Sequence, residues 1–259
     1  MRQDRYYNQS QYGASRRCSN PMRLRPGMLY SGIWLALLLG LLHLPASAGM
    51  LGFPAPRQQP WHMRFELAGD SFKEELQNTG DAEATTGRAL ATVAFGLTSW
   101  SEIFARFGTA EFNVHEALFS GNFGLAYGGG LRLRLLQLPL GVLGASAHYL
   151  RFTSTDNDVA GARVEGEWKE FDIAVGIGTR RTGPFEFYAG GAYHQSDITL
   201  KTPSTGQRTT LESKLPFRGF VGIHIYPLAD IPSGKFLVNV EARFIGETPQ
   251  VTLGVQYAF

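Results

Sequence analysis

Apolar and polar residues alternate with a period of two over most of this chain, and this pattern constrains the fold more than any other feature. Within residues 235–245 the apolar positions are Phe236, Val238, Val240, Ala242 and Phe244, with Asn239, Glu241 and Arg243 between them. A period of two gives an extended strand one apolar and one polar face. The pattern predicts ten strands, at residues 61–73, 86–97, 102–114, 121–136, 140–153, 161–178, 184–199, 211–226, 235–245 and 249–259.

The predicted strands are roughly 10–17 residues long, whereas strands of soluble proteins usually have about 5–6 residues. Such lengths suit tilted strands that cross a bilayer and project beyond it. Alternation by itself also fits a soluble sandwich, in which the apolar faces meet in a core. Three further features favour the membrane alternative.

The N-terminal region has the form of a secretory signal peptide. Residues 33–44, IWLALLLGLLHL, are apolar but too short for the roughly 20 residues of a spanning helix. Arg23 and Arg25 precede this stretch, and a small-x-small cleavage motif formed by Ala46 and Ala48 follows it. We therefore expect export through the Sec pathway and cleavage after Ala48, with translation starting at Met1 or at Met22.

Removal of residues 1–48 changes the charge and the redox chemistry. The whole chain has 24 Lys and Arg against 22 Asp and Glu, whereas residues 49–259 have 18 against 21, a net charge of −3. The basic excess belongs to the leader, so nucleic-acid binding loses its only support. The single cysteine, Cys18, also leaves, and the exported chain is expected to have no disulfide and no lipoprotein anchor.

Aromatic residues and loop composition supply the other two features. Large rings lie near the strand ends, as expected for aromatic girdles at two membrane interfaces; these are Trp61, Phe185, Phe187, Tyr257 and Phe259 towards one end, and Phe119, Phe123, Tyr193 and Phe244 towards the other. Odd-numbered connections are polar and rich in turn formers, whereas even-numbered ones are mostly shorter. Both termini then lie on the periplasmic side.

These observations predict an all-β fold, a closed antiparallel transmembrane β-barrel of residues 61–259. A Pro-rich periplasmic tail, residues 49–60, separates it from the signal peptide. The chain ends in mid-strand because an unpaired backbone group in hydrocarbon costs several kcal/mol, so the last strand must pair with the first. The strand count is about ten, or eight if the first hairpin or the ninth and tenth strands are miscounted.

Two segments resemble known outer-membrane barrels. The terminal VTLGVQYAF is similar to the C-terminal signature of bacterial outer-membrane β-barrel proteins, and Phe95–Phe112, FGLTSWSEIFARFGTAEF, resembles a hairpin of the general small-barrel family. The resemblance implies the outer membrane of a Gram-negative bacterium. It also implies that Tyr257 and Phe259 are read by the barrel-assembly machinery, with periplasmic chaperones acting in biogenesis and membrane lipids and lipopolysaccharide as surroundings. It carries over no activity.

Charged residues at inward positions allow two interpretations, a selective narrow pore or a lumen filled by paired charges. The residues expected to face the lumen include Arg132, Arg134, Arg163, Glu165, Glu167, Arg218, Glu241 and Arg243. In residues 161–178 the charged positions and the apolar positions Phe171 to Ile177 fall on the same odd phase. A β-bulge near Lys169–Glu170 would restore the facing.

A catalytic alternative rests on His194, Ser196 and Asp197 beside the turn Asp156-Asn157-Asp158. Asp156 and Asp158 facing a His–Asp couple would be similar to omptins, the outer-membrane proteases, although residues 194 and 197 face opposite ways on a strand. His194 and Ser196 also resemble the His/Ser pair of lipid A deacylases, without a partner Glu. We expect a non-enzymatic structural, surface-interaction or narrow-pore role, with no cofactor and no metal; an outer-membrane enzyme is the alternative.

Overall fold

The computed structural model describes residues 52–56, 59–77, 81–157, 161–226, 235–245 and 248–258, apart from the side chains of residues 235, 245 and 248–250. The predicted signal peptide with Ala46 and Ala48, both candidate start residues, Asp158 and the terminal Phe259 lie outside the described residues. No helix in the described part of the chain is long and apolar enough to cross a membrane.

All strands of the described chain belong to one antiparallel sheet. They are β1 (Met63–Gln77), β2 (Asp81–Gly96), β3 (Ser101–Val114), β4 (Phe119–Ser120), β5 (Gly124–Leu138), β6 (Gly141–Asn157), β7 (Arg163–Thr179), β8 (Phe185–Thr202), β9 (Gln207–Ser213), β10 (Phe217–Ile225), β11 (Lys235–Ile245) and β12 (Thr248–Ala258). The prediction of an all-β fold with about ten antiparallel strands is confirmed.

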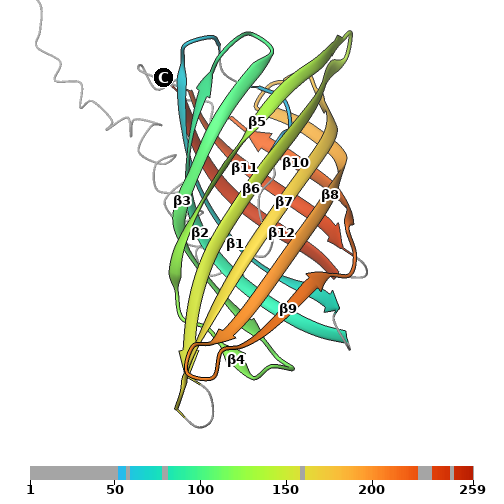
Figure 1. The fold of residues 1–259 in the computed structure, drawn as a ribbon. Helices are drawn as coiled ribbons and strands as arrows, with labels where there is room; N and C mark the ends of the chain where they lie inside the picture. Colours follow the sequence, from blue (N-terminus) through green and yellow to red (C-terminus); the bar gives the residue numbers. More distant parts are fainter. Residues whose placement is uncertain are drawn as a thin grey trace, which may run out of the picture. The chain divides into compact units, whose positions relative to one another are not determined.

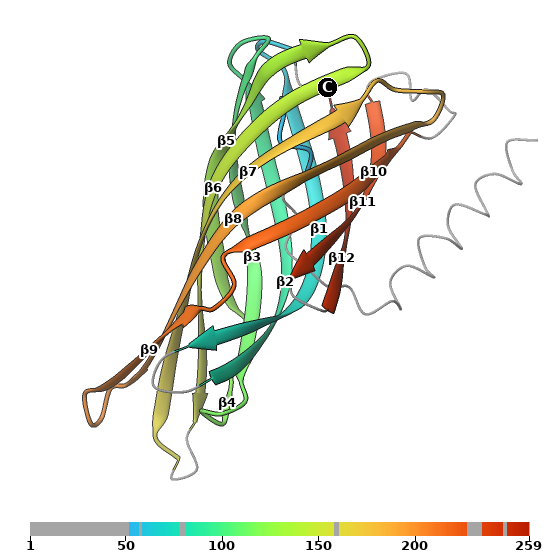
Figure 2. The same cartoon turned by 90° about the vertical axis from the view of Figure 1, so that its right-hand side faces the viewer.

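Ten of the strands form a ring, and β4 and β9 are short additions to it (Figures 1 and 2). The last strand β12 pairs with β1, where Tyr257 lies opposite Phe65. On the other side β10 pairs with β8 from Phe217↔Tyr193 to Ile225↔Phe185. The ring order therefore follows the chain order, as expected for antiparallel strands joined by hairpins.

The two ends of the ring differ, and we name them by their connections. The short-turn end contains the turns 97–100, 139–140 and 180–184, and the β4–β9 end contains β4 and β9. Towards the β4–β9 end the strands run past their predicted ends, because residues such as Glu74–Gln77 and Asp81–Thr85 continue the β1–β2 ladder.

The segment predicted as one strand at residues 211–226 is divided into β9 and β10 by residues 214–216. Glu212 pairs with Asp197 and Phe217 with Tyr193, so the segment has one residue more than the stretch of β8 that it faces. Pro216 contributes a carbonyl to the amide of His194 at 2.6 Å but, like any proline, has no N–H to donate. The irregularity therefore lies here.

The bulge predicted near Lys169–Glu170 is wrong. The register of β7 with β6 runs unbroken from Thr179↔Gly141 to Arg163↔Asn157. All odd positions of β7 point outward, whereas the even positions Trp168, Glu170 and Asp172 are buried. The odd residues therefore change from apolar to charged along one outer face of β7, without a change of facing.

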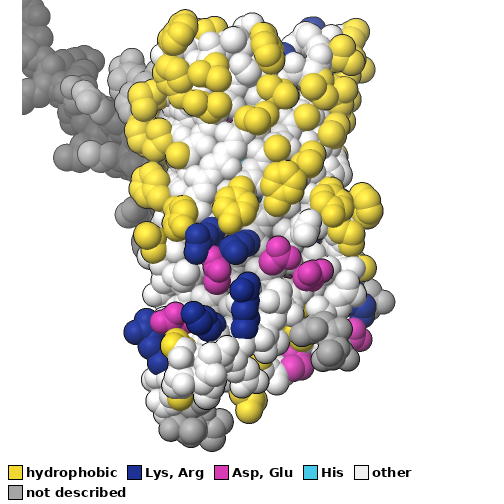
Figure 3. Space-filling view, viewed as in Figure 1, with side chains coloured by type: hydrophobic (Ala, Val, Ile, Leu, Met, Phe, Trp, Pro, Cys, Tyr) yellow, Lys and Arg dark blue, Asp and Glu magenta, His cyan; other side chains and the backbone are white. Residues whose placement is uncertain are grey.

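Figure 3 shows this change on the outer surface, where apolar side chains cover the part nearest the short-turn end and a band of charged side chains follows towards the β4–β9 end. We call these the apolar belt and the charged collar. A row of outward aromatic side chains, 39–76% exposed, marks the boundary. The row consists of Phe107, Tyr127, Tyr149, Phe171, Tyr193, Phe217 and Phe244. Phe119, predicted in this girdle, instead points inward and is buried.

Candidate functional site

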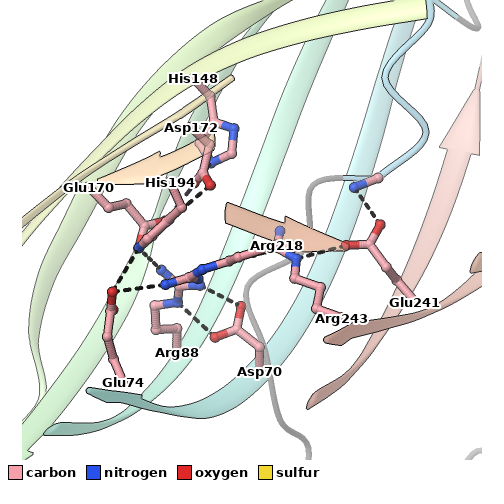
Figure 4. A network of polar contacts seen from close by, with 11 residues as sticks. Asp70, Glu74, Arg88, His148, Glu170, Asp172, His194, Arg218, Glu241 and Arg243 are labelled. Carbon is pink, nitrogen blue, oxygen red and sulfur yellow. Dashed lines mark hydrogen bonds and ion pairs between the residues drawn. The ribbon is translucent and has the colours of Figure 1, made fainter. Parts of the chain in front are cut away.

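The interior of the barrel holds every cluster of buried charge in the described chain, so the candidate site is built from inward side chains. It has three parts: an N-terminal segment near the short-turn end, a network of charged residues, and an aromatic cluster towards the β4–β9 end. Figure 4 shows the middle part.

Residues 52–56 lie inside the ring, where all five are buried. The Phe53 ring lies 5.8 Å from the ring of Tyr188. The amide of Gly52 donates to Glu241 Oε2 at 3.0 Å, and the Pro56 carbonyl accepts from Arg134 at 3.4 Å. This part of the Pro-rich segment therefore differs from the predicted extended periplasmic tail, because it is buried inside the ring.

Small residues on β6 and β7 make the room for this segment. A Cβ added at Gly144 would lie 2.5 Å from the Ala55 Cβ, and one at Gly178 would lie 2.6 Å from the Phe53 ring. Gly144 and Gly176 are register partners. Side chains larger than glycine at these inward positions would displace the segment.

The central network is a row of side chains across three neighbouring strands. His148 of β6, Asp172 of β7 and His194 of β8 are direct cross-strand partners. Nε2 of His148 lies 3.0 Å from Oδ2 of Asp172, and Nδ1 of His194 lies 2.8 Å from Oδ1. The chain of contacts continues from His194 Nε2 to Glu74 Oε1 at 3.2 Å.

Two arginines balance the carboxylates of this row. Arg218 donates from Nη2 to Glu74 Oε1 at 2.8 Å. Arg88 donates to both oxygens of Asp70, at 2.7 and 3.3 Å, and from Nη1 to Glu170 Oε2 at 2.6 Å. All of these side chains are buried. Buried charges of this kind need partners, because an unpaired one costs several kcal/mol.

A second group of charges lies among β1, β3 and β5. Oε1 of Glu102 accepts hydrogen bonds from Arg64 Nη2 and Arg132 Nη1, both at 2.7 Å. The Arg132 guanidinium also lies 4.5 Å from the centre of the Phe104 ring. One buried carboxylate oxygen therefore bridges two guanidiniums.

An aromatic cluster fills the barrel towards the β4–β9 end. Trp168 stacks on Phe152 with ring centroids 5.4 Å apart and meets Phe112 and Phe72 edge-on at 5.5 and 5.9 Å. Leucine and isoleucine side chains of β1, β6, β8 and β9 complete the cluster; they are Leu76, Leu150, Ile198, Leu200 and Leu211. These contacts leave this half of the interior apolar.

The structure divides the residues predicted to face the lumen into two sets. Arg132, Arg218, Glu241 and Arg243 are buried inside, and Arg134 is half-buried beside Pro56. The lumen placement of Arg163, Glu165 and Glu167 is wrong, because these side chains lie on the outer surface in the charged collar. There Arg163 pairs with Glu165 at 3.4 Å, and Glu167 pairs with Arg151 and Lys169.

The predicted catalytic group is not brought together. His194 and Ser196 both point inward and are buried, but Asp156 lies near the barrel rim, where its Oδ2 accepts the amide of Ser120 at 2.6 Å. The carboxylates that contact His194 are Asp172 and Glu74, which are 22 and 120 residues away in the chain. Only the strand register could have identified them, although a polar Asp172 within the apolar run of residues 171–177 was a signal.

Replacing Glu102 by glutamine tests the buried ion network. Glu102→Gln removes the charge between Arg64 and Arg132, and we expect the free energy of unfolding to fall by about 3–5 kcal/mol, because two guanidiniums then lose their common counter-ion. The measurement is urea unfolding of the refolded chain in lipid vesicles.

The matched control is Glu165→Gln on the outer surface, where the Arg163 pair is exposed and the expected loss is about 0–1 kcal/mol. Equal losses for the two variants would contradict the assignment of Glu102 to a buried network.

Comparison with known proteins gives a consistent but weak likeness. No family model matches the sequence, and no curated protein matches it. Among solved structures, the translocator domain of the autotransporter NalP from Neisseria meningitidis has 13% identity and a TM-score of 0.43, over 90% of this chain and 96% of that one. The outer membrane protease OmpT from Escherichia coli has 13% identity and a TM-score of 0.44, over 81% of this chain and 99% of that one. Likenesses at this level assign neither a family nor an activity.

Proposed function

We propose that this chain is a non-conducting outer-membrane β-barrel protein with a structural or surface-interaction role. The observation that carries the proposal is the filling of the lumen by side chains and backbone of the described residues. Residues 52–56, the buried ion network and the aromatic cluster follow one another from the short-turn end to the β4–β9 end.

The apolar belt supports the membrane location. Its outward side chains include Phe65, Leu67, Ile173 and Val175, which are 43–66% exposed in the isolated barrel. Contiguous apolar surface of this extent is rare on soluble proteins. Acyl chains would cover it, and the backbone in that zone is already paired around the ring, as hydrocarbon requires.

The proposed orientation places the short-turn end in the periplasm and the charged collar at the cell surface. Residues 52–56, which are buried inside the ring, are then separated from the proposed cleavage site at Ala48 by only residues 49–51. Export through the Sec pathway, chaperone escort and recognition of Tyr257 and Phe259 by the barrel-assembly machinery are parts of the same proposal.

The enzymatic alternative loses support from the burial of its central residue. His194 and Asp172 are 0% and 1% exposed. The apolar cluster around Trp168 lies between this pair and the β4–β9 end, so neither a peptide nor lipid A at the cell surface has a path to it among the described residues. A general acid or base must reach the substrate within hydrogen-bonding distance.

Planar-bilayer recording tests the closed lumen. The mature chain, refolded and inserted, is expected to give no stable conductance steps, because side chains and residues 52–56 occupy the path that ions would take. A general porin reconstituted in parallel shows that the bilayer supports conductance. Deleting residues 52–56 is expected to leave the barrel closed, since the ion network and the aromatic cluster remain. Stable open channels in most insertions of the unaltered chain would overturn the proposal.

The charged collar supports an interaction with lipopolysaccharide. Arg151 and Lys169 are cross-strand partners on β6 and β7, two register positions beyond the aromatic pair Tyr149 and Phe171 and on the same outer face. If that pair marks the membrane interface, Arg151 and Lys169 lie at the level of the phosphate groups of the outer leaflet. Cations at this level attract phosphate both by charge and by hydrogen bonding.

Substitution of the basic pair tests this interaction. Arg151→Ala combined with Lys169→Ala is expected to weaken the binding of lipid A to the detergent-solubilised barrel by about tenfold, equivalent to about 1.4 kcal/mol. Titration followed by native mass spectrometry measures the change. The matched control is Arg180→Ala with Arg181→Ala at the short-turn end, where binding should be unchanged. If lipid A binding decreased equally in both double variants, or did not decrease in either, the charged collar would not be a lipopolysaccharide-binding surface.

A further inference from the structure

Three buried side chains in the central network direct ligand-type atoms at one point. Nε2 of His148, a carboxylate oxygen of Glu170 and a carboxylate oxygen of Asp172 all lie within 4.8 Å of one another. The distances from His148 Nε2 are 3.9 Å to Glu170 Oε1 and 3.0 Å to Asp172 Oδ2. Protein ligands bind zinc at about 2.0–2.2 Å, so three ligands of one ion lie roughly 3–4 Å apart. Small movements of the side chains would bring the three atoms to those positions.

In each of the two carboxylates, the oxygen that does not face His148 contacts a separate partner. Glu170 uses Oε2 for Arg88 at 2.6 Å and keeps Oε1 on the side of His148. Asp172 uses Oδ1 for His194 at 2.8 Å and keeps Oδ2 on that same side. Metal sites are built in this way, with an outer group that fixes each ligand and leaves one lone pair for the ion.

The atom at the centre of the arrangement has no hydrogen-bond partner. Oδ2 of Asp172 is buried and makes no hydrogen bond, although Nε2 of His148 lies 3.0 Å away. A buried carboxylate oxygen without a donor costs free energy. A cation bound there would supply the missing interaction.

We propose that His148, Glu170 and Asp172 form a buried site for one divalent transition-metal ion, held in place by Arg88 and His194. One imidazole and two carboxylates suit zinc, and the absence of a soft thiolate ligand argues against a copper(I) site. The ion would stabilise the interior of the barrel by joining β6 to β7. The register explains why the sequence did not reveal it, since His148 and Asp172 are separated by 23 residues of hairpin.

Metal content after refolding tests the site. The chain is refolded with zinc chloride, freed of loose metal by gel filtration with a weak chelator, and analysed for zinc by mass spectrometry. We expect about one zinc per unaltered chain and at least a tenfold lower content in His148→Ala and in Glu170→Gln, because each loses a ligand. The midpoint of thermal unfolding should rise with zinc for the unaltered chain but not for these two variants.

The matched control is His224→Ala. His224 is also a buried inward histidine, but it stacks on Tyr188 at 4.7 Å, away from the proposed ligands, and its variant should keep the metal. Heat-modifiability on a gel shows that each variant has folded, and Glu170→Gln retains the size of the native side chain if His148→Ala fails to fold. Zinc content that is low in the unaltered chain, or equal in the unaltered chain and the two ligand variants once they have folded, would overturn the site. Retention of calcium in place of zinc would overturn the choice of ion.

Discussion

Backbone hydrogen bonding around the ring is the constraint on which the rest of the structure depends. Each of the ten ring strands has a neighbour on both sides, including the pairing of β12 with β1. A strand with an open edge could not be placed in hydrocarbon, because its unpaired amides and carbonyls would each cost several kcal/mol. With the backbone paired, the outer side chains are free to be apolar, and the inner ones must fill a narrow space.

The narrow interior explains the combination of features found there. The lumen is narrow and buried, so the inward arginines need carboxylate partners, as Glu102 shows between Arg64 and Arg132. Where the wall has glycine, at Gly144 and Gly178, the space is taken by Phe53 and Ala55 from the N-terminal segment. Packing and charge pairing together leave the lumen filled in the described part of the chain.

The sequence predicted the strands well, because a period of two is a local property that can be recognised within each segment alone. It failed where the outcome depends on the surroundings. Glu165 and Phe171 share the outer face of β7, but Glu165 lies in the charged collar and Phe171 in the aromatic row. The switch from charged to apolar residues along this one face was therefore misinterpreted as a switch from the inner to the outer face. The site also depends on register, which brings His148, Asp172 and His194 into one row although they are far apart in the chain.

The outer face of β7 offers the most direct test of the central claim that acyl chains cover the apolar belt and water reaches the collar. A nitroxide spin label is placed singly at each odd position from Arg163 to Ile177 of the barrel in lipid vesicles. Its collisions with oxygen, which dissolves in hydrocarbon, are compared with those with a water-soluble nickel chelate. If acyl chains cover the apolar belt, collisions with oxygen dominate at positions 171–177 and collisions with the nickel chelate dominate at positions 163–167. Strong collisions with the nickel chelate at positions 173–177 would contradict this claim.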